Sequence, residues 1–282
     1  MAEEESKRSI GSWVQILSSG QLPVLRQTVR SLTEARERIS SINGREITEI
    51  VMRDPLMAVR VLAYVRPYYA KRRLKDIANV EHAVMMLGVE PFFKYFANLQ
   101  TVEDMLKPYP QSLVGLLYIV RRSQRAARYA FEWAVWRRTA NIEEIYMSAL
   151  LYDLAEILMW CYAPQQSSKI LAMQRADSTL RSAEAQEQIF GFKVIELQQM
   201  LCKTWQLPEL LLSQFNPEHK DHPRFQNVKL AVDLARHSAR GWDNAALPDD
   251  FSAIEKLLNI NREMLLFRLG LRDAQGNEIT PS

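Results

Sequence analysis

Cationic and aromatic side chains alternate in one short segment of the chain, "YVRPYYAKRRLK" at 64–75. Five cations and three tyrosines fall within these twelve residues. Such a mixture can hold a nucleotide or a single-stranded nucleic acid, because bases stack on aromatic rings while cations bind phosphates. An ordinary solvated helix face, balanced by nearby acids such as Asp76 and Glu81, explains the same composition. The segment therefore forms a candidate interaction surface, made of Tyr64, Arg66, Tyr68, Tyr69, Lys71, Arg72 and Arg73.

A second group of cations comprises Arg121, Arg122, Arg125 and Arg128. Helical spacing places Arg121, Arg125 and Arg128 on one face. The same two interpretations apply here: contact with phosphate, or a solvated helix face. Trp133 and Trp136 follow on the same predicted helix. We expect these two rings to anchor the core or an interface rather than to stack on a ligand.

The four histidines are the next residues whose side chains could bind a metal or take part in chemistry: His82, His219, His222 and His237. The segment "EHKDH" gives His219 and His222 a spacing that could suit a metal, but it is polar, is followed by proline and lacks a third obvious donor. A solvated loop is the favoured interpretation, and the other two histidines are expected to be structural. No glycine-rich phosphate loop or nucleophile-elbow motif occurs in the sequence.

The bulk composition indicates a helical protein of moderate charge. Of the 282 residues, 48% are hydrophobic and 24% are charged, and the low numbers of glycine (9) and proline (12) favour helix over sheet. The formal net charge of +3 is far from that of a dedicated nucleic-acid-binding protein. Cys161 and Cys202 are expected to be buried thiols, with a disulfide as the alternative. We expect a cytoplasmic protein without membrane contact, because the N-terminus is polar and the most apolar run, 147–163, contains two acidic residues.

Apolar residues recur at helical spacing along almost the whole chain, and no convincing alternating strand pattern occurs. Asp54 is a natural N-cap for the helix that starts at Pro55, and another helix is expected to start at Asn79 and stop at Gly88. Single helices are predicted at 22–39, 46–53, 90–106, 112–138 and 141–162, the last being the most apolar. Further helices are predicted near 178–190, 192–204, 208–215, 224–239, 249–260 and 261–269. These patterns predict an all-α fold.

Taken together, these segments resemble the HDOD family, the HD-related output domain of bacterial signalling proteins. The resemblance spans about residues 15–240 and rests in the first half on "LPVL" at 22–25, Asp54-Pro55, Tyr68-Tyr69 and the helix end from Ala83 to Gly88. In the second half it rests on "SALLYDLAEIL" at 148–158, on 189–209 and on "VKLAVDLA" at 228–235. The sequence departs from the family pattern at Val65-Arg66-Pro67, at Val194 and near Asn216-Pro217.

The resemblance implies a multi-helical HD-like bundle preceded by a smaller N-terminal helical subdomain. On this basis we assign residues 1–19 to an N-terminal tail and 20–110 to the N-terminal helical subdomain. Residues 111–245 are assigned to a degenerate HD-like helical subdomain and 246–282 to a C-terminal helical extension.

The resemblance also implies a site that has lost its metal ligands. HD phosphohydrolases collect two histidines and two aspartates around divalent metals, and the matching positions here are Arg122, Tyr152, Asp153 and Asp233. Neither histidine is present, so we expect no metal and no cofactor. We predict that Arg122 replaces the metal as a fixed cation between the two carboxylates, with bidentate geometry, and that Tyr152 donates its hydroxyl to a neighbouring acceptor. The alternative is that Asp153 bonds locally and Arg122 points to solvent.

Two kinds of function remain open. The first is a non-catalytic signalling module that binds another signalling protein, carried on a separate polypeptide, through the groove between the subdomains or through the Tyr68/Tyr69 edge. The second is a regulator that binds a nucleotide or nucleic acid through the segment at 64–75. A metal-dependent phosphohydrolase is a third interpretation, which the loss of the metal ligands disfavours.

Overall fold

The computed structural model describes residues 8–72, 79–177, 179–219 and 221–272, with backbone only for 67–72 and Pro217. The N-terminal helices are α1 (Ile10–Ser19), α2 (Arg26–Glu37), α3 (Gly44–Met52), α4 (Pro55–Arg72), α5 (Val80–Leu87), α6 (Val89–Tyr95) and α7 (Val102–Met105). The later ones are α8 (Pro110–Trp136), α9 (Ile142–Leu150), α10 (Leu154–Tyr162), α11 (Pro164–Ala176), α12 (Ser182–Phe190), α13 (Val194–Trp205), α14 (Glu209–Ser213), the 3-10 helix η1 (Pro217–His219), α15 (Pro223–His237), α16 (Leu247–Leu258) and α17 (Arg262–Arg268). The predicted all-α class is confirmed, since the described residues contain no β-strand.

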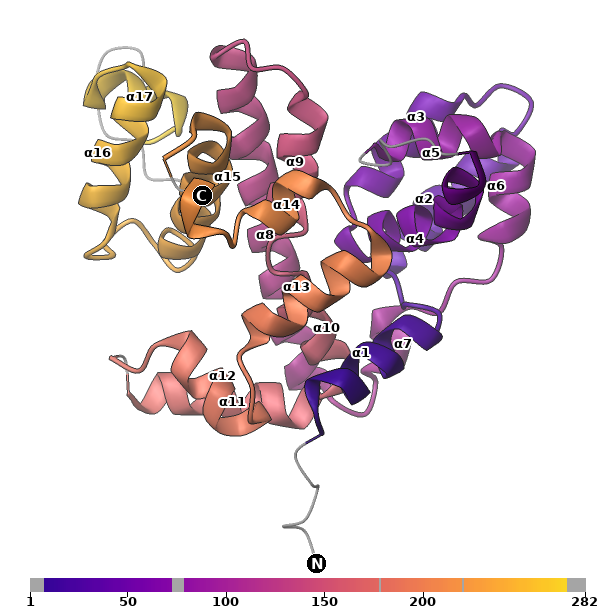
Figure 1. Cartoon of the computed structure of the whole chain (residues 1–282), viewed down its shortest axis with the longest axis horizontal. Helices are drawn as coiled ribbons and strands as arrows, with labels where there is room; N and C mark the ends of the chain where they lie inside the picture. The colour runs from indigo at the N-terminus through magenta and orange to yellow at the C-terminus, as the bar shows by residue number, and fades with distance from the viewer. Residues whose placement is uncertain (1–7, 73–78, 178, 220, 273–282) are drawn as a thin grey trace, which may run out of the picture.

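The long helix α8 and the shorter α9 pack against each other at the centre of the molecule, and α15 packs against both (Figure 1). Helices α2 to α6 gather on one side of this centre, and α16 and α17 lie on the other (Figure 1). Close packing at α8 depends on Gly115, because a Cβ there would lie 2.4 Å from the ring of Trp160 on α10. The arrangement is the expected HD-like bundle preceded by a smaller helical part.

Asp54 connects the N-terminal helices. One of its carboxylate oxygens accepts hydrogen bonds from the amides of Leu56 and Met57 at the start of α4, as the predicted N-cap requires. The other oxygen accepts from the amide of Leu25 (2.8 Å) and the hydroxyl of Thr28 (2.8 Å). Because Asp54 is fully buried, these four donors replace the water that the carboxylate has lost. Asp54 therefore fixes the start of α2 against the start of α4.

The prediction of one helix at 90–106 is wrong, because the chain leaves α6 at Tyr95 and re-enters a helix only at Val102. Between them the backbone pairs with the segment before α2. Val24 donates to the carbonyl of Gln100 and accepts from the amide of Val102, both at 2.9 Å. This tertiary pairing buries Val24 and Val102 completely and outweighs the local helical pattern. For the same reason α2 starts at Arg26 rather than at residue 22.

The assignment of residues 1–19 to a tail is also wrong for its second half. Ile10–Ser19 form α1, which is capped by the Ser9 hydroxyl and packs against α13. Trp13 and Leu17 are buried there. An amphipathic segment gains stability by covering an apolar surface, and the sequence pattern does not reveal a partner some 180 residues away.

The predicted limits of α5 and the predicted state of the two cysteines agree with the structure. Asn79 caps α5 and Gly88 ends it, and Cys161 and Cys202 are free and buried. Among the described residues, no helix is both long enough and apolar enough to cross a membrane.

Candidate functional site

The segment at 148–158 does not form part of one continuous helix, contrary to the prediction for 141–162. Helix α9 ends at Leu150 and α10 starts at Leu154, so Tyr152 and Asp153 lie in the turn between them. The buried side chain of Gln198 on α13 makes this break possible. Its amide nitrogen donates to the carbonyl of Leu151 (2.8 Å), and its oxygen accepts from the amide of Ala155 (2.7 Å). Gln198 thus satisfies backbone groups on both sides of the turn that a continuous helix would have paired.

Arg122 on α8 points at the Asp153 carboxylate, as predicted. Its Nε and Nη2 atoms both donate to the Oδ2 atom of Asp153, at 3.1 and 2.6 Å. The two side chains are only 11% and 10% exposed. The predicted ion pair is therefore confirmed for Asp153, but the two bonds converge on one carboxylate oxygen instead of spanning both.

Two further side chains explain this geometry. The Nη2 atom of Arg122 also donates to the Oε2 atom of Glu156 at 2.9 Å, and Arg236 on α15 approaches the second oxygen of Asp153 at 3.3 Å. Asp153 is therefore held between two guanidinium groups, and Arg122 is held between two carboxylates. Glu156 follows Asp153 by three residues, a spacing that could have suggested it from the sequence. Arg236 carries no comparable signal, because only the packing of α15 brings it to the site.

The charges in this cluster reinforce one another. Burial by itself disfavours an ionised Asp153, but the guanidinium groups of Arg122 and Arg236 outweigh that effect and hold the pKa of the carboxyl below its usual range. Burial likewise disfavours a charged Arg122, yet Asp153 and Glu156 raise the pKa of its guanidinium. Both partners are therefore charged at neutral pH.

Tyr152 occupies the position next to Asp153, where the family resemblance would place a histidine. Its ring contacts that of Phe215, with centroids 5.5 Å apart. Burial, together with the nearby charge of Asp153, raises the pKa of the phenol to about 12, so the group is neutral. The predicted hydrogen bond from the Tyr152 hydroxyl is wrong as far as the described residues go, since the hydroxyl has no partner among them.

Asp233 on α15 does not bind Arg122, and the prediction of a cation shared by both aspartates is wrong on this point. Its carboxylate pairs instead with Lys229, one helical turn earlier on the same helix. The charge of Asp233 also contributes to the raised pKa of Tyr152, so the carboxylate lies within electrostatic reach of the site. A local partner four residues away satisfies Asp233, which leaves Arg122 to Asp153 and Glu156.

Three of the histidines make contacts with other described residues. His219 and His222 both contact the ring of Phe225, and the Nδ1 atom of His222 accepts from the amide of Arg224. His237 pairs with Asp250 at 2.6 Å. In the described part of the chain, no three His, Cys, Asp or Glu side chains lie close enough to share a metal ion.

The candidate interaction surface at 64–73 is only partly described. Tyr64 packs against Tyr95 and Phe96, and Arg66 donates to the carbonyl of Thr204 on α13. These two side chains thus make internal contacts that connect α4 with other helices. The side chains of Tyr68, Tyr69, Lys71 and Arg72 are outside the description, and Arg73 lies outside the described residues altogether.

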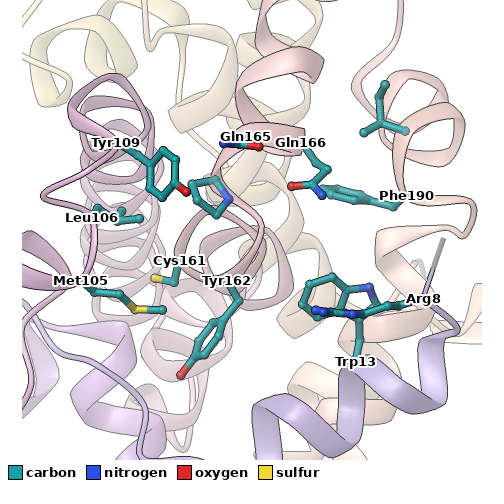
Figure 2. Close-up of a pocket in the computed structure, with 12 residues that line it drawn as sticks. Arg8, Trp13, Met105, Leu106, Tyr109, Cys161, Tyr162, Gln165, Gln166 and Phe190 are labelled. Carbon is teal, nitrogen blue, oxygen red and sulfur yellow. The ribbon is translucent and has the colours of Figure 1, made fainter. Parts of the chain in front are cut away.

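A cavity of about 590 Å³ opens between the N-terminal helices and the lower part of the bundle. Figure 2 shows its walls, which include Met105, Leu106, Tyr109, Cys161, Tyr162, Trp13 and Phe190. Arg8 covers the ring of Trp13 at 5.3 Å. Burial raises the pKa of the Cys161 thiol and keeps it protonated, which makes it a poor nucleophile. The lining also includes the polar side chains of Gln165 and Gln166.

The fold and this cluster can be compared with known proteins. A model of the HDOD domain matches residues 22–220, which is more than half of the chain. The chain belongs to the HDOD family. The match lies inside the span of about 15–240 inferred from the sequence motifs.

Solved structures share the HDOD chain's fold at low sequence identity. A virulence factor from Campylobacter jejuni subsp. jejuni superposes with a TM-score of 0.65 and 19% identity, covering 95% of this chain and 94% of that one. The MmoQ response regulator from Methylococcus capsulatus strain Bath gives a TM-score of 0.65 and 18% identity, covering 88% and 97%. No curated protein sequence matches the chain. At these identities the structural matches establish the fold alone.

Proposed function

We propose that this HDOD chain is a non-catalytic signalling module that acts by binding another protein. The observation that carries the non-catalytic part is the position of Arg122. Its guanidinium donates two hydrogen bonds to Asp153, the residue that the family resemblance equates with a metal ligand. The cation that HD phosphohydrolases take from solution is supplied here by the chain itself.

The residues at the site do not fit a divalent metal. A metal at Asp153 would have to displace a buried guanidinium and would meet a second one from Arg236. Tyr152 is neutral and its phenol is a poor substitute for imidazole as a ligand. Removing one member of a buried ion pair costs about 3–5 kcal/mol, because the other charge is left uncompensated. The site therefore favours a fixed structural role over water activation.

The proposal that the chain binds another protein rests on the family and on proteins of the same fold. The family resemblance is to an output domain of bacterial signalling proteins, and one protein of the same fold, MmoQ, is named a response regulator. A domain that passes on a signal without chemistry must do so by contact. We place the contact at the C-terminal end of α4, where the sequence concentrates tyrosines and cations, with Tyr68 and Arg72 as its test residues.

Metal analysis tests the non-catalytic part. We expect protein purified without chelator to contain no stoichiometric divalent metal and to hydrolyse no phosphoester, and Tyr152→His alone to leave both results unchanged because Arg122 remains. Replacing both positions, Arg122→His with Tyr152→His, removes the obstructing cation and serves as the comparison. Stoichiometric metal in the wild-type chain, or metal-dependent hydrolysis by it, would refute the proposal.

Binding measurements test the protein-interaction part. A partner captured from a bacterial lysate would be purified, and its affinity measured for the wild-type chain and for Tyr68→Ala and Arg72→Ala. Matched controls are Tyr118→Ala and Arg30→Ala, which change a partly exposed tyrosine and an exposed arginine elsewhere. We expect the first two changes to weaken binding and the controls to leave it intact. Equal affinity of all four variants would exclude the end of α4 as the contact.

A further inference from the structure

Four arginines line a second cavity, of about 600 Å³, between the N-terminal helices and the bundle. They are Arg53, Arg121, Arg125 and Arg128. The neutral polar side chains of Gln27, Thr28, Ser31 and Gln124 also face it, and no acidic side chain is among its lining residues. Its volume falls within the range of sites that bind small molecules.

One face of α8 supplies most of the cavity. Arg121, Gln124, Arg125, Arg128 and Phe131 follow one another at helical spacing, and each lies on the side of α8 that lines the cavity. The opposite wall comes from the start of α2 and the end of α3, which Asp54 holds in place through Leu25 and Thr28. Arg122 is turned out of this face toward Asp153. The same helix therefore sends one arginine into the ion-pair cluster and three into the cavity.

The cavity's cations are poorly neutralised. Within the described residues, Arg53 and Arg121 make no ion pair, and Arg128 has only the exposed Glu132 at 3.8 Å. Arg125 donates from Nη2 to the carbonyl of Ala235 at 2.6 Å, but its Nε atom is buried without a hydrogen-bond partner. A buried N–H group of a charged side chain is costly unless something accepts its hydrogen bond. An anionic ligand in the cavity would supply such an acceptor.

An aromatic ring stands beside these cations. Phe131 is 44% exposed, and the cavity includes it. Its edge-to-face contact with Tyr146, at 6.3 Å and 87°, holds the ring in place. Tyr146 is in turn fixed by donating its hydroxyl to the carbonyl of Met52 at 3.1 Å. A rigid, partly exposed ring can receive a stacked aromatic base.

We infer that this cavity binds a nucleotide, with its phosphates on the arginines and its base against Phe131. The arginine fork is suited to phosphate, and the two kinds of group lie on one helix face within one bounded volume. An extended nucleic acid would need a broad basic surface, which a chain of net charge +3 does not provide. The inference goes beyond the proposed function, since it concerns a small ligand and a different surface.

Titration calorimetry at about 50 mM salt tests the inference, because phosphate contacts are only weakly screened there. The probes are ATP, GTP and cyclic di-GMP, with inorganic pyrophosphate and adenosine for the two halves of the ligand. We expect at least one nucleotide to bind. Arg121→Met and Arg128→Met should each weaken that binding by about tenfold, the effect of one lost charge-assisted hydrogen bond.

The control variants distinguish binding in this cavity from a general effect of positive charge on the protein surface. Arg30→Met removes an exposed arginine of α2 that pairs with Glu34, and it should bind like the wild type. Phe131→Ala should weaken nucleotide binding while leaving pyrophosphate binding unchanged. Because Arg121 and Arg128 are exposed, both variants should fold, which their circular dichroism and melting temperature would verify.

Several outcomes would overturn the inference. One is the failure of all three nucleotides to bind the wild-type chain, and another is unchanged binding by both arginine variants. If pyrophosphate bound as tightly as the nucleotides, Phe131 would have no role in binding the base. Tighter binding of a single-stranded oligonucleotide would assign the arginines to nucleic acid instead.

Discussion

Arg122 is a buried cation whose two carboxylate partners have few other sources of compensation. Replacing it with alanine leaves Glu156 without an ion pair among the described residues and leaves Asp153 with only the more distant Arg236. We expect Arg122→Ala to lower the free energy of unfolding by about 3–5 kcal/mol, measured by urea denaturation.

The neighbouring residue provides the control. Arg121 is exposed, so Arg121→Ala should change the free energy of unfolding little. Equal effects of the two substitutions would show that Arg122 contributes only as a surface charge.

The lowered pKa of Asp153 predicts how the stability of the protein depends on pH. An unfolded aspartate titrates near pH 3.9, and Arg122 and Arg236 hold the folded pKa lower despite burial. The ion pair's stabilisation is therefore fully present above about pH 4 and is lost as the pH falls through the folded pKa. The stability difference between the wild type and Asp153→Asn should stay constant from neutral pH down to about pH 4 and shrink below it. A difference that already declines between pH 7 and 5 would contradict a depressed pKa.

At the scale of elements, Gln198 decides where α9 ends and α10 begins. Gln198→Leu keeps a side chain of similar size but removes the donor to Leu151 and the acceptor for Ala155. Each buried backbone group left without a partner costs about 1–3 kcal/mol, so we expect a clear loss in the urea midpoint.

Gln199 is the matched comparison, because it is the same residue type one position later and is only half-buried. Gln199→Leu should leave the urea midpoint nearly unchanged. If Gln198→Leu behaved the same way, the turn would be held by the ion pairs alone.

At the scale of the whole molecule, α1 at the start of the chain stabilises α13, which lies far along the sequence. Trp13 is 6% exposed where α1 packs against α13. Trp13→Ala should lower the free energy of unfolding by about 3–5 kcal/mol, as for other buried large aromatic residues. Gln15→Ala, on the exposed side of α1, should have little effect. A small loss for Trp13→Ala would contradict a stabilising role for the contact between α1 and α13.

The sequence by itself determined the helical class, the caps at Asp54, Asn79 and Gly88, and the long helix α8, because periodicity and capping are properties of neighbouring residues. It also indicated the pairing of Arg122 with Asp153, through the family resemblance and the high cost of a buried unpaired carboxylate.

Only the tertiary structure decided where local helical patterns are interrupted. The breaks at 96–101 and 151–153 follow from partners remote in the sequence, Val24 in one case and Gln198 in the other. Packing likewise brought Arg236 to Asp153 and left Asp233 with Lys229. Long-range contacts of this kind compete with local propensity in free energy, and no pattern within one helix records their outcome.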